Sequence, residues 1–375
     1  MRKSQRVLGV LVSTWMVASL GANAQMNRSR PTAITDGQDL ERIRESWRVL
    51  EPVTCHNLSV YPVVSNLKLE TGQFLTLDEG LASGVVRILE QGQVEGSLYR
   101  RRDSRRWPPT EGVRPDFGGA NVNELVLVND SSQPLILLAG EVVSGGKQNR
   151  IIGADLVVPP KSSPLPLAVF CVEHGRWSSG TSFGSAKTMA HPEVRMEAQA
   201  KKSQAGVWES VSRAAAGLGT ASPTSNYQDL VSSPRAEKAF NEIATSLESD
   251  YERELREDPR GRNSVGVVVA VDGQLIWTDV FTGQEQFRKY WPKLLRSYVM
   301  EAESRPSDRK RVPSAKEAEA FLLEDGGHAS VQIEPGAYRR TEISAKNYEV
   351  VALEALGKWE DTGLLVHYSK MARDQ

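Results

Sequence analysis

The sequence predicts an α+β fold with an antiparallel, β-rich core, arranged as a sandwich or a barrel, and several packed amphipathic helices. Short runs of valine, isoleucine and leucine are separated by polar turns, a pattern typical of antiparallel strands. Apolar residues recur at intervals of three and four along 235–256 and 287–299, which indicates two long amphipathic helices. Strand-like and helix-like segments also occur in separate blocks, without the alternation that builds a parallel sheet.

The first 24 residues have the features of a secretory signal peptide. Three basic residues precede a largely apolar run at 7–20, and Ala22-Asn23-Ala24 supplies small residues at the cleavage positions. We therefore expect cleavage after Ala24 and export to the periplasm or the cell exterior. An uncleaved anchor is the alternative. No later segment approaches the roughly 18 apolar residues of a membrane span, so none is expected in the mature chain.

Charge argues against nucleic acid as a partner. Without residues 1–24 the chain carries 43 Lys and Arg against 47 Asp and Glu, a net charge near −4. We expect a polar N-terminal extension at 25–53, followed by a single α+β domain at 54–370. The one basic cluster, residues 99–109, is either a solvated loop or a contact for an anion or a partner protein.

Local signals place several elements. Thr76 and Ser314 are each followed three residues later by glutamate, which predicts capping boxes at two helix starts. The segment 265–281, with Asp272-Gly273 at its centre, carries the strongest hairpin signal in the chain. Residues 178–185 are rich in glycine and serine and are expected to form a mobile loop. The C-terminal strands are expected at 329–334, 348–354 and 363–368.

The stretch 134–177 is the predicted site, because its apolar runs are joined by turns that concentrate charged and amide side chains. The glycines of Gly145-Gly146-Lys147 would let a backbone approach an anion, but neither the spacing nor the following strand fits a phosphate loop. The expected ligand-binding residues have donor groups for an anion or a ring that can stack: Lys147, Gln148, Arg150, Arg176 and Trp177. The alternative is a plain hairpin turn whose charges pair with one another.

Other chemistry in this stretch is less specific. Glu141 and Glu173 are weak candidates for a general base, and if the strands at 134–143 and 164–173 were neighbours, the two could approach one another and one pKa would rise. Cys171 follows an apolar run, which favours a buried thiol over a nucleophile. Cys55 and Cys171 could form one disulfide or remain two thiols. The five histidines show no metal-ligand spacing, and neither a metal nor a cofactor is expected.

Five segments in order resemble the bacterial ARG and rhodanese-phosphatase-superfamily-associated protein (ARPP) domain family, a domain of unknown function, over roughly 55–370. They are Leu75–Gly84, Val122–Leu125, Leu138–Gln148, Cys171–Trp177 and Phe287–Tyr298. The resemblance implies association with ADP-ribosyl-glycohydrolase and phosphatase-type partners, and hence nucleotide-like or phosphorylated ligands. The signal peptide, the polar extension and the basic 99–109 segment depart from the family pattern.

The leading hypothesis is an exported protein that binds a small anionic ligand, phosphorylated or nucleotide-like, through the loops at 141–150 and 173–177. One alternative is a hydrolase that acts on such a ligand with Glu141 or Glu173 as general base and Lys147 and Arg176 as anion clamps. Another is an envelope module that binds a protein partner or serves a structural role. The sequence leaves open whether the protein is an enzyme.

Overall fold

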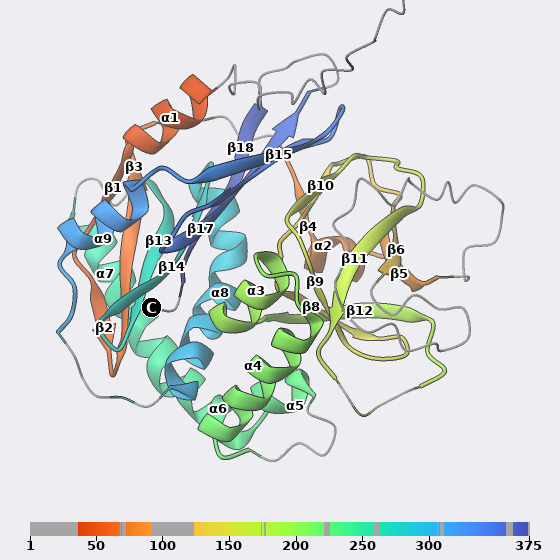
Figure 1. Ribbon diagram of the computed structural model, residues 1–375, viewed down its shortest axis with the longest axis horizontal. Helices are drawn as coiled ribbons and strands as arrows, with labels where there is room; N and C mark the ends of the chain where they lie inside the picture. Colours follow the sequence, from red (N-terminus) through yellow and green to blue (C-terminus); the bar gives the residue numbers. More distant parts are fainter. Residues whose placement is uncertain are drawn as a thin grey trace, which may run out of the picture.

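The computed structural model describes residues 37–67, 69, 73–91, 124–173, 175, 178–220, 226–258, 263–305, 307, 311–357 and 363–373. It confirms the predicted α+β class with a β-rich core. A large antiparallel sheet and a closed six-stranded barrel lie on either side of a layer of helices (Figure 1).

The large sheet has nine strands, and all of its pairings are antiparallel. Along the sheet they follow the order β1 (Trp47–Val49), β3 (Leu58–Ser65), β13 (Ser264–Val271), β14 (Gln274–Phe281), β18 (Gly363–Ala372), β17 (Tyr348–Leu356), β16 (Tyr338–Ser344) and β15 (His328–Glu334), with β2 (Val53–Cys55) also paired to β3. The large sheet therefore includes β1, which precedes position 54, and β2, which spans it.

The barrel closes through antiparallel pairs in the order β11 (Leu165–Cys171), β6 (Glu124–Asn129), β5 (Val86–Glu90), β12 (Ser182–Met189), β8 (Glu141–Gly145) and β9 (Arg150–Ile152). A separate small sheet contains β10 (Leu156–Val158), β7 (Leu135–Leu137) and β4 (Leu75–Thr76), and its β4–β7 pair is parallel. Chain segments close together in sequence thus alternate between the barrel and the small sheet.

The long helix α8 (Gln284–Ser304) contacts both the large sheet and the barrel, with Pro292 inside it. The other helices are α1 (Gly37–Glu45), α2 (Leu77–Ala82), α3 (Pro192–Gln199), α4 (Gln204–Gly217), α5 (Tyr227–Val231), α6 (Pro234–Ala239), α7 (Thr245–Glu257) and α9 (Ala315–Leu323), with a π-helical turn at Phe240–Ala244 between α6 and α7. None of the described helices is both long and apolar enough to cross a membrane.

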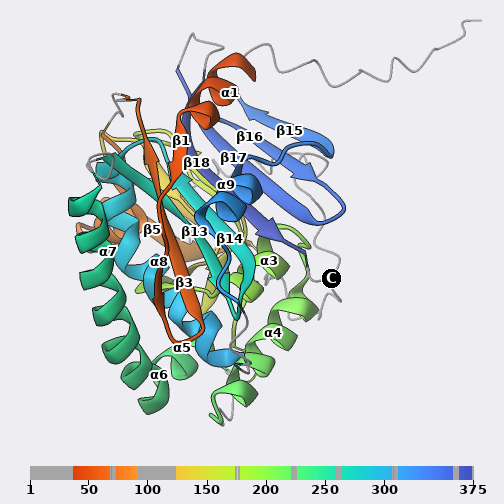
Figure 2. The same ribbon diagram turned by 90° about the vertical axis from the view of Figure 1, so that its left-hand side faces the viewer.

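The central strands of the large sheet are buried on both faces. Residues such as Val267 and Val269 belong to the main core, which includes α8 and the barrel. Tyr61 and Val268 point to a second core under α1 and α9 (Figure 2). The continuous valine run of β13 follows from this arrangement, because a strand covered on both sides has no polar face.

Both capping boxes form as predicted: the hydroxyls of Thr76 and Ser314 accept from the backbone three residues on, and the glutamates reach back. The predicted hairpin is β13–β14, and its two turn residues, Asp272 and Gly273, have φ values of 50° and 79°. Positive φ at both positions matches the type I′ turn that the Asp-Gly pair favours.

Two local expectations are revised. The loop expected at 178–185 contains the start of β12, whose polar residues form the outer wall of the barrel while Phe183 and Met189 are buried. Cys55 and Cys171 are both free thiols, Cys55 on the large sheet and Cys171 on the barrel. The disulfide alternative is therefore wrong for this structure.

Candidate functional site

The predicted ligand loop is a tight hairpin between β8 and β9, closed against β12. Gly145 and Gly146 have φ values of 119° and 52°, which disfavour any residue with a side chain. A Cβ at Gly145 would lie 2.6 Å from the carbonyl oxygen of Ser182, and one at Gly146 would collide with the ring of Phe183. The glycine pair therefore serves the close approach of β12.

Arg150, the first residue of β9, is fully buried at 0% exposure. Its Nη1 donates to the side-chain oxygen of Gln148 over 3.4 Å and to the Asn149 carbonyl over 3.2 Å, both neutral acceptors. Its Nε has no hydrogen-bond partner. Within the described ranges, no aspartate or glutamate forms an ion pair with this guanidinium.

A second fully buried arginine shows what Arg150 lacks. Arg195, on α3, makes a bidentate ion pair with Asp279 over 2.8 and 2.9 Å and lies 4.5 Å from the ring centroid of Trp277. The Nε of Arg195, like that of Arg150, has no hydrogen-bond partner among the described residues. The two arginines therefore differ in that Arg195 binds a carboxylate, that of Asp279. Arg195 thus has an ion-pair partner, whereas Arg150 has none among the residues that the structure describes.

The groups around Arg150 include buried carboxylates, but none among the described residues forms an ion pair with it. Cys171 lies opposite Arg150 in the β9–β11 register. Burial raises the pKa of the Cys171 thiol, Arg150 opposes this rise and Glu90 adds to it. The buried carboxylate of Glu90 accepts the backbone amide of Lys147 over 2.8 Å. Cys171 is therefore a neutral thiol at neutral pH, which does not repel an anion.

The structure separates the two glutamates that were considered as a possible pair. Glu141 begins β8, and Glu173 lies two residues beyond the end of β11; these two strands are not neighbours, because β9 lies between them. Arg150 pairs with both Val143 and Cys171, so Glu141 and Glu173 lie on opposite sides of it in register. They are about 13 Å apart along the strand direction, at about 3.3 Å a residue. The structure therefore does not bring these two carboxylates together.

Glu141 belongs to a different buried cluster. Its carboxylate accepts the Leu138 amide over 2.7 Å and forms an ion pair with Lys293 of α8, whose Nζ also lies 3.0 Å from Asp78. Burial opposes the charge on Lys293, but the two carboxylates outweigh it and raise its pKa. Burial raises the pKa of Glu141, with Lys293 opposing the rise. Glu141 thus joins the barrel to α8 and is engaged away from Arg150.

The structure brings Lys147, Gln148 and Arg150 together at one end of the barrel, with Glu173 at the same end. Glu173 is 1% exposed, and its carboxylate accepts the Asn149 amide over 3.2 Å. The predicted residues Arg176 and Trp177, and the basic segment 99–109, lie outside the described residues. Their part in the site stays a prediction.

Sequence reasoning missed a buried polar network around His367. His367 of β18 lies between two aspartates: its Nδ1 is 2.7 Å from Asp155 and its Nε2 is 3.0 Å from Asp279. Asp279 also binds Arg195 and accepts the hydroxyl of Tyr298. All five side chains are fully buried. Burial lowers the pKa of His367, but the two aspartates outweigh it and raise that pKa to about 9, so the ring is charged at neutral pH.

The turn at Leu138–Glu141 connects this network with the Glu141 cluster. The Ala139 amide donates to Asp155 over 2.7 Å, and Gly140, at a φ of 91°, packs against Arg195. A Cβ at Gly140 would lie 2.5 Å from Cγ of Arg195. The Leu-Ala-Gly-Glu segment is therefore a joint between barrel, helices and large sheet. The sequence marks this joint by a charged residue, Glu141, inside an apolar run. Asp279 and His367 likewise lie inside apolar runs.

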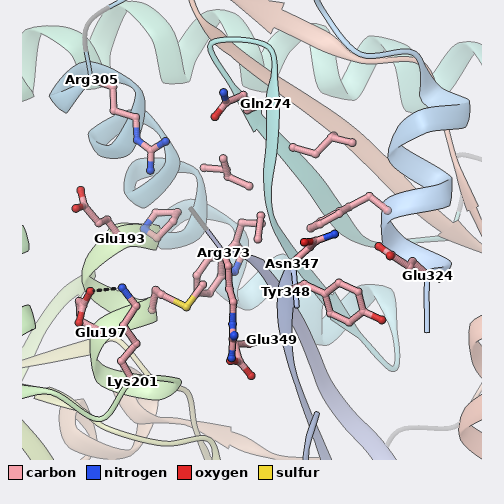
Figure 3. A pocket seen from close by; sticks show the side chains of 17 residues that line it. Glu193, Glu197, Lys201, Gln274, Arg305, Glu324, Asn347, Tyr348, Glu349 and Arg373 are labelled. Carbon is pink, nitrogen blue, oxygen red and sulfur yellow. Dashed lines mark hydrogen bonds and ion pairs between the residues drawn. The ribbon is translucent and has the colours of Figure 1, made fainter. Parts of the chain in front are cut away.

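A cleft of about 750 Å³ opens elsewhere, at one end of the large sheet (Figure 3). Its walls carry several ion pairs, including Lys201 with Glu197 over 2.7 Å and Arg373 with Glu349. Because these charges neutralise one another, the cleft has no strong preference for an anion or a cation. No residue predicted to bind a ligand lines it.

Comparison with known proteins identifies the family. Residues 46–371 match the model of the ARG and Rhodanese-Phosphatase-superfamily-associated Protein domain, and the chain belongs to this family. No curated protein and no solved structure matches the chain significantly. The resemblance seen in the sequence is thus confirmed over nearly the whole chain.

Proposed function

We propose that this member of the family binds a small anion, phosphorylated or carboxylated, at the end of the barrel where Arg150 lies, and that the Arg150 guanidinium is its anchor. One observation carries the proposal: the guanidinium is fully buried, and no described carboxylate pairs with it. Burial of an arginine is costly unless an opposite charge compensates for the lost hydration. A bound anion would supply that charge.

The neighbouring groups suit an anion of this kind. A guanidinium presents its donors as a planar fork that matches the oxygen pairs of phosphate and carboxylate groups. Gln148 already contacts Arg150 over 3.4 Å, and its amide N–H₂ can donate to the same anion. The neutral Cys171 thiol adds no repulsion. An anion here would replace contacts that Arg150 now makes only with neutral oxygens.

Thermal-shift measurements test the proposal. The purified protein is screened against inorganic phosphate, a nucleoside monophosphate, a sugar phosphate and a dicarboxylate. We expect at least one to raise the melting temperature of the wild type and to have no effect on Arg150→Ala. The matched control is Arg87→Ala, because Arg87 lies on the same barrel but is about half exposed and pairs with Asp130. Equal responses in all three proteins would contradict the proposal.

Removal of the unpaired charge should also change the stability of the ligand-free protein. We expect Arg150→Met to raise the free energy of unfolding in anion-free buffer, by about 1–4 kcal/mol, because methionine fills much of the same volume without a buried charge. Urea denaturation in a zwitterionic buffer measures the difference. A loss of several kcal/mol would mean that Arg150 already has a counter-charge within the folded chain.

A hydrolase remains a second candidate, and one observation now favours Glu173 over Glu141 as its base. Glu173 lies at the Arg150 end of the barrel, whereas Glu141 is engaged by Lys293. For any phosphorylated compound that binds, we expect Glu173→Gln to abolish hydrolysis while the compound still raises the melting temperature. If the compound is hydrolysed equally by Glu173→Gln, this assignment is wrong. If it is bound but not hydrolysed by the wild type, the protein is a binder of that compound.

We also propose that the protein acts outside the cytoplasm, because residues 1–24 have the pattern of a cleavable signal peptide. When the full chain is expressed in a bacterium, the mature form is expected in the periplasmic fraction with Gln25 as its first residue. N-terminal sequencing measures this directly. A cytoplasmic product that retains residues 1–24 would contradict export and would favour cytosolic nucleotides as ligands.

A further inference from the structure

The last strand of the large sheet has one open edge. β15 pairs with β16 over seven consecutive residues without a bulge, and no other described strand pairs with it. Two of its apolar side chains, Val331 and Ile333, are 40% and 51% exposed, and the one other large hydrophobic exposed in the described chain is Val312. A flat, apolar edge with unpaired backbone groups is a template for another strand.

The opposite edge of the same sheet is protected. β1 has only three residues and lies beside α9. The backbone amide of Val49 donates to the carboxylate of Glu319 on α9 over 3.0 Å, which occupies a donor that an added strand would need. β15 lacks the features that commonly protect a sheet edge: His328–Glu334 contains no proline, lysine or arginine and forms no bulge.

The edge is also held in the conformation that pairing requires. Arg340 of β16 is buried and donates to the side chain of Gln332 over 2.7 Å, and the same arginine donates to the Asp155 carbonyl over 3.3 Å. Gln332 in turn contacts the hydroxyl of Tyr338 over 3.3 Å. These contacts fix β15 on β16, so little conformational freedom is lost when a second strand adds to it.

We infer that β15 pairs antiparallel with β15 of a second copy of this chain, about a twofold axis through Val331, so that the large sheets of the two copies form one continuous sheet. Centred on Val331, this register places His328 opposite Glu334 of the other copy, twice, and Ala329 opposite Ile333. Val331 meets its own counterpart at the axis.

The register is self-complementary in charge and in shape. A histidine faces a carboxylate at both ends of the paired segment, so the register brings no like charges together. Ala329, Val331 and Ile333 lie on one face of β15, and each would pack against one of the same three residues in the other copy. The small Ala329 would lie opposite the large Ile333, so the apolar side chains would pack without a steric clash. The inference rests on the sheet edge and is independent of anion binding at Arg150.

Cysteine cross-linking tests the register. Val331→Cys and Ile333→Cys are made separately in a Cys55→Ala background, which removes the more exposed native thiol, and each is oxidised with copper phenanthroline. Directly opposed residues have Cβ atoms about 4.5–5.5 Å apart, within reach of a disulfide after a small shift. We expect a covalent dimer with Val331→Cys and little or none with Ile333→Cys, which lies opposite Ala329. No cross-link in either variant would overturn this pairing.

Light scattering during size-exclusion chromatography tests the dimer itself. We expect the wild type to be dimeric at micromolar concentration. Val331→Lys places two like charges at the axis and should raise the dimer dissociation constant at least about tenfold. Val312→Lys is the control, because it makes the same change at an exposed apolar residue outside β15 and should leave the dimer intact. A monomeric wild type, or equal dissociation constants for both variants, would contradict the proposal.

Discussion

Asp279→Ala is expected to lower the free energy of unfolding by about 3–5 kcal/mol, the cost of breaking a buried ion pair from one side. Asp279 receives both terminal nitrogens of Arg195, the ring of His367 and the hydroxyl of Tyr298, and all are fully buried. Without the carboxylate, the Arg195 guanidinium is left in the core with no ion-pair partner among the described residues. Most domains have a total stability of about 5–15 kcal/mol, so this loss is large.

Urea denaturation of wild type and variant measures this loss. Asp130→Ala is the matched control, since its ion pair with Arg87 is about half exposed and should be worth at most about 1 kcal/mol. If Asp279→Ala fails to fold, the double variant Arg195→Met with Asp279→Leu provides a second readout. It should be more stable than Asp279→Ala, because it removes both charges. A loss below about 1 kcal/mol for Asp279→Ala would show that the network contributes little.

Stability is expected to fall between about pH 6.5 and pH 9 as His367 loses its proton. The ordinary pKa of histidine is about 6.5, which is the unfolded value, and Asp155 and Asp279 raise the folded value to about 9. A raised folded pKa means that the folded state binds the proton more tightly. The stabilisation is therefore complete below pH 6.5, amounts to about 3 kcal/mol, and is lost as pH rises through 9.

The comparison of wild type with His367→Gln isolates this effect. The buried amine of Lys370 titrates in a nearby range with opposite sign, because burial lowers its pKa to about 8 and stability then rises with pH. That contribution is common to both proteins and cancels in their difference. We expect the difference in unfolding free energy to shrink by about 3 kcal/mol from pH 6 to pH 10. A difference independent of pH would mean that His367 is not charged in the folded protein.

Local sequence signals predicted those parts of the fold that depend on neighbouring residues. Asp272-Gly273 is sufficient for a type I′ hairpin, and Thr76 and Ser314 with their glutamates are sufficient for helix starts. The start of β12 was missed because it follows a run of glycine and serine and buries only two side chains of its eight, Phe183 and Met189. Such a strand is stabilised by its neighbours β5 and β8, which the sequence does not show to be close.

The candidate site was predictable only in part, for the same reason. Lys147, Gln148 and Arg150 are adjacent in sequence, so their proximity followed directly. The network of Asp155, Asp279 and His367 joins segments more than 80 residues apart, and only the tertiary fold brings them together. The sequence could not show that Arg150 is buried, or that no described carboxylate forms an ion pair with it. The second property distinguishes Arg150 from Arg195, which pairs with Asp279.

Titration calorimetry is the most direct test of Arg150 as an anion anchor. Inorganic phosphate, and then the compound with the largest thermal shift, are titrated into the wild type and into Arg150→Met under identical buffer conditions. If Arg150 is the anchor, the wild type binds one anion per chain saturably, and the variant binds it about 10- to 100-fold more weakly, as expected for loss of a charged hydrogen-bonding group. Equal affinity in the two proteins would contradict the assignment of Arg150 as anchor.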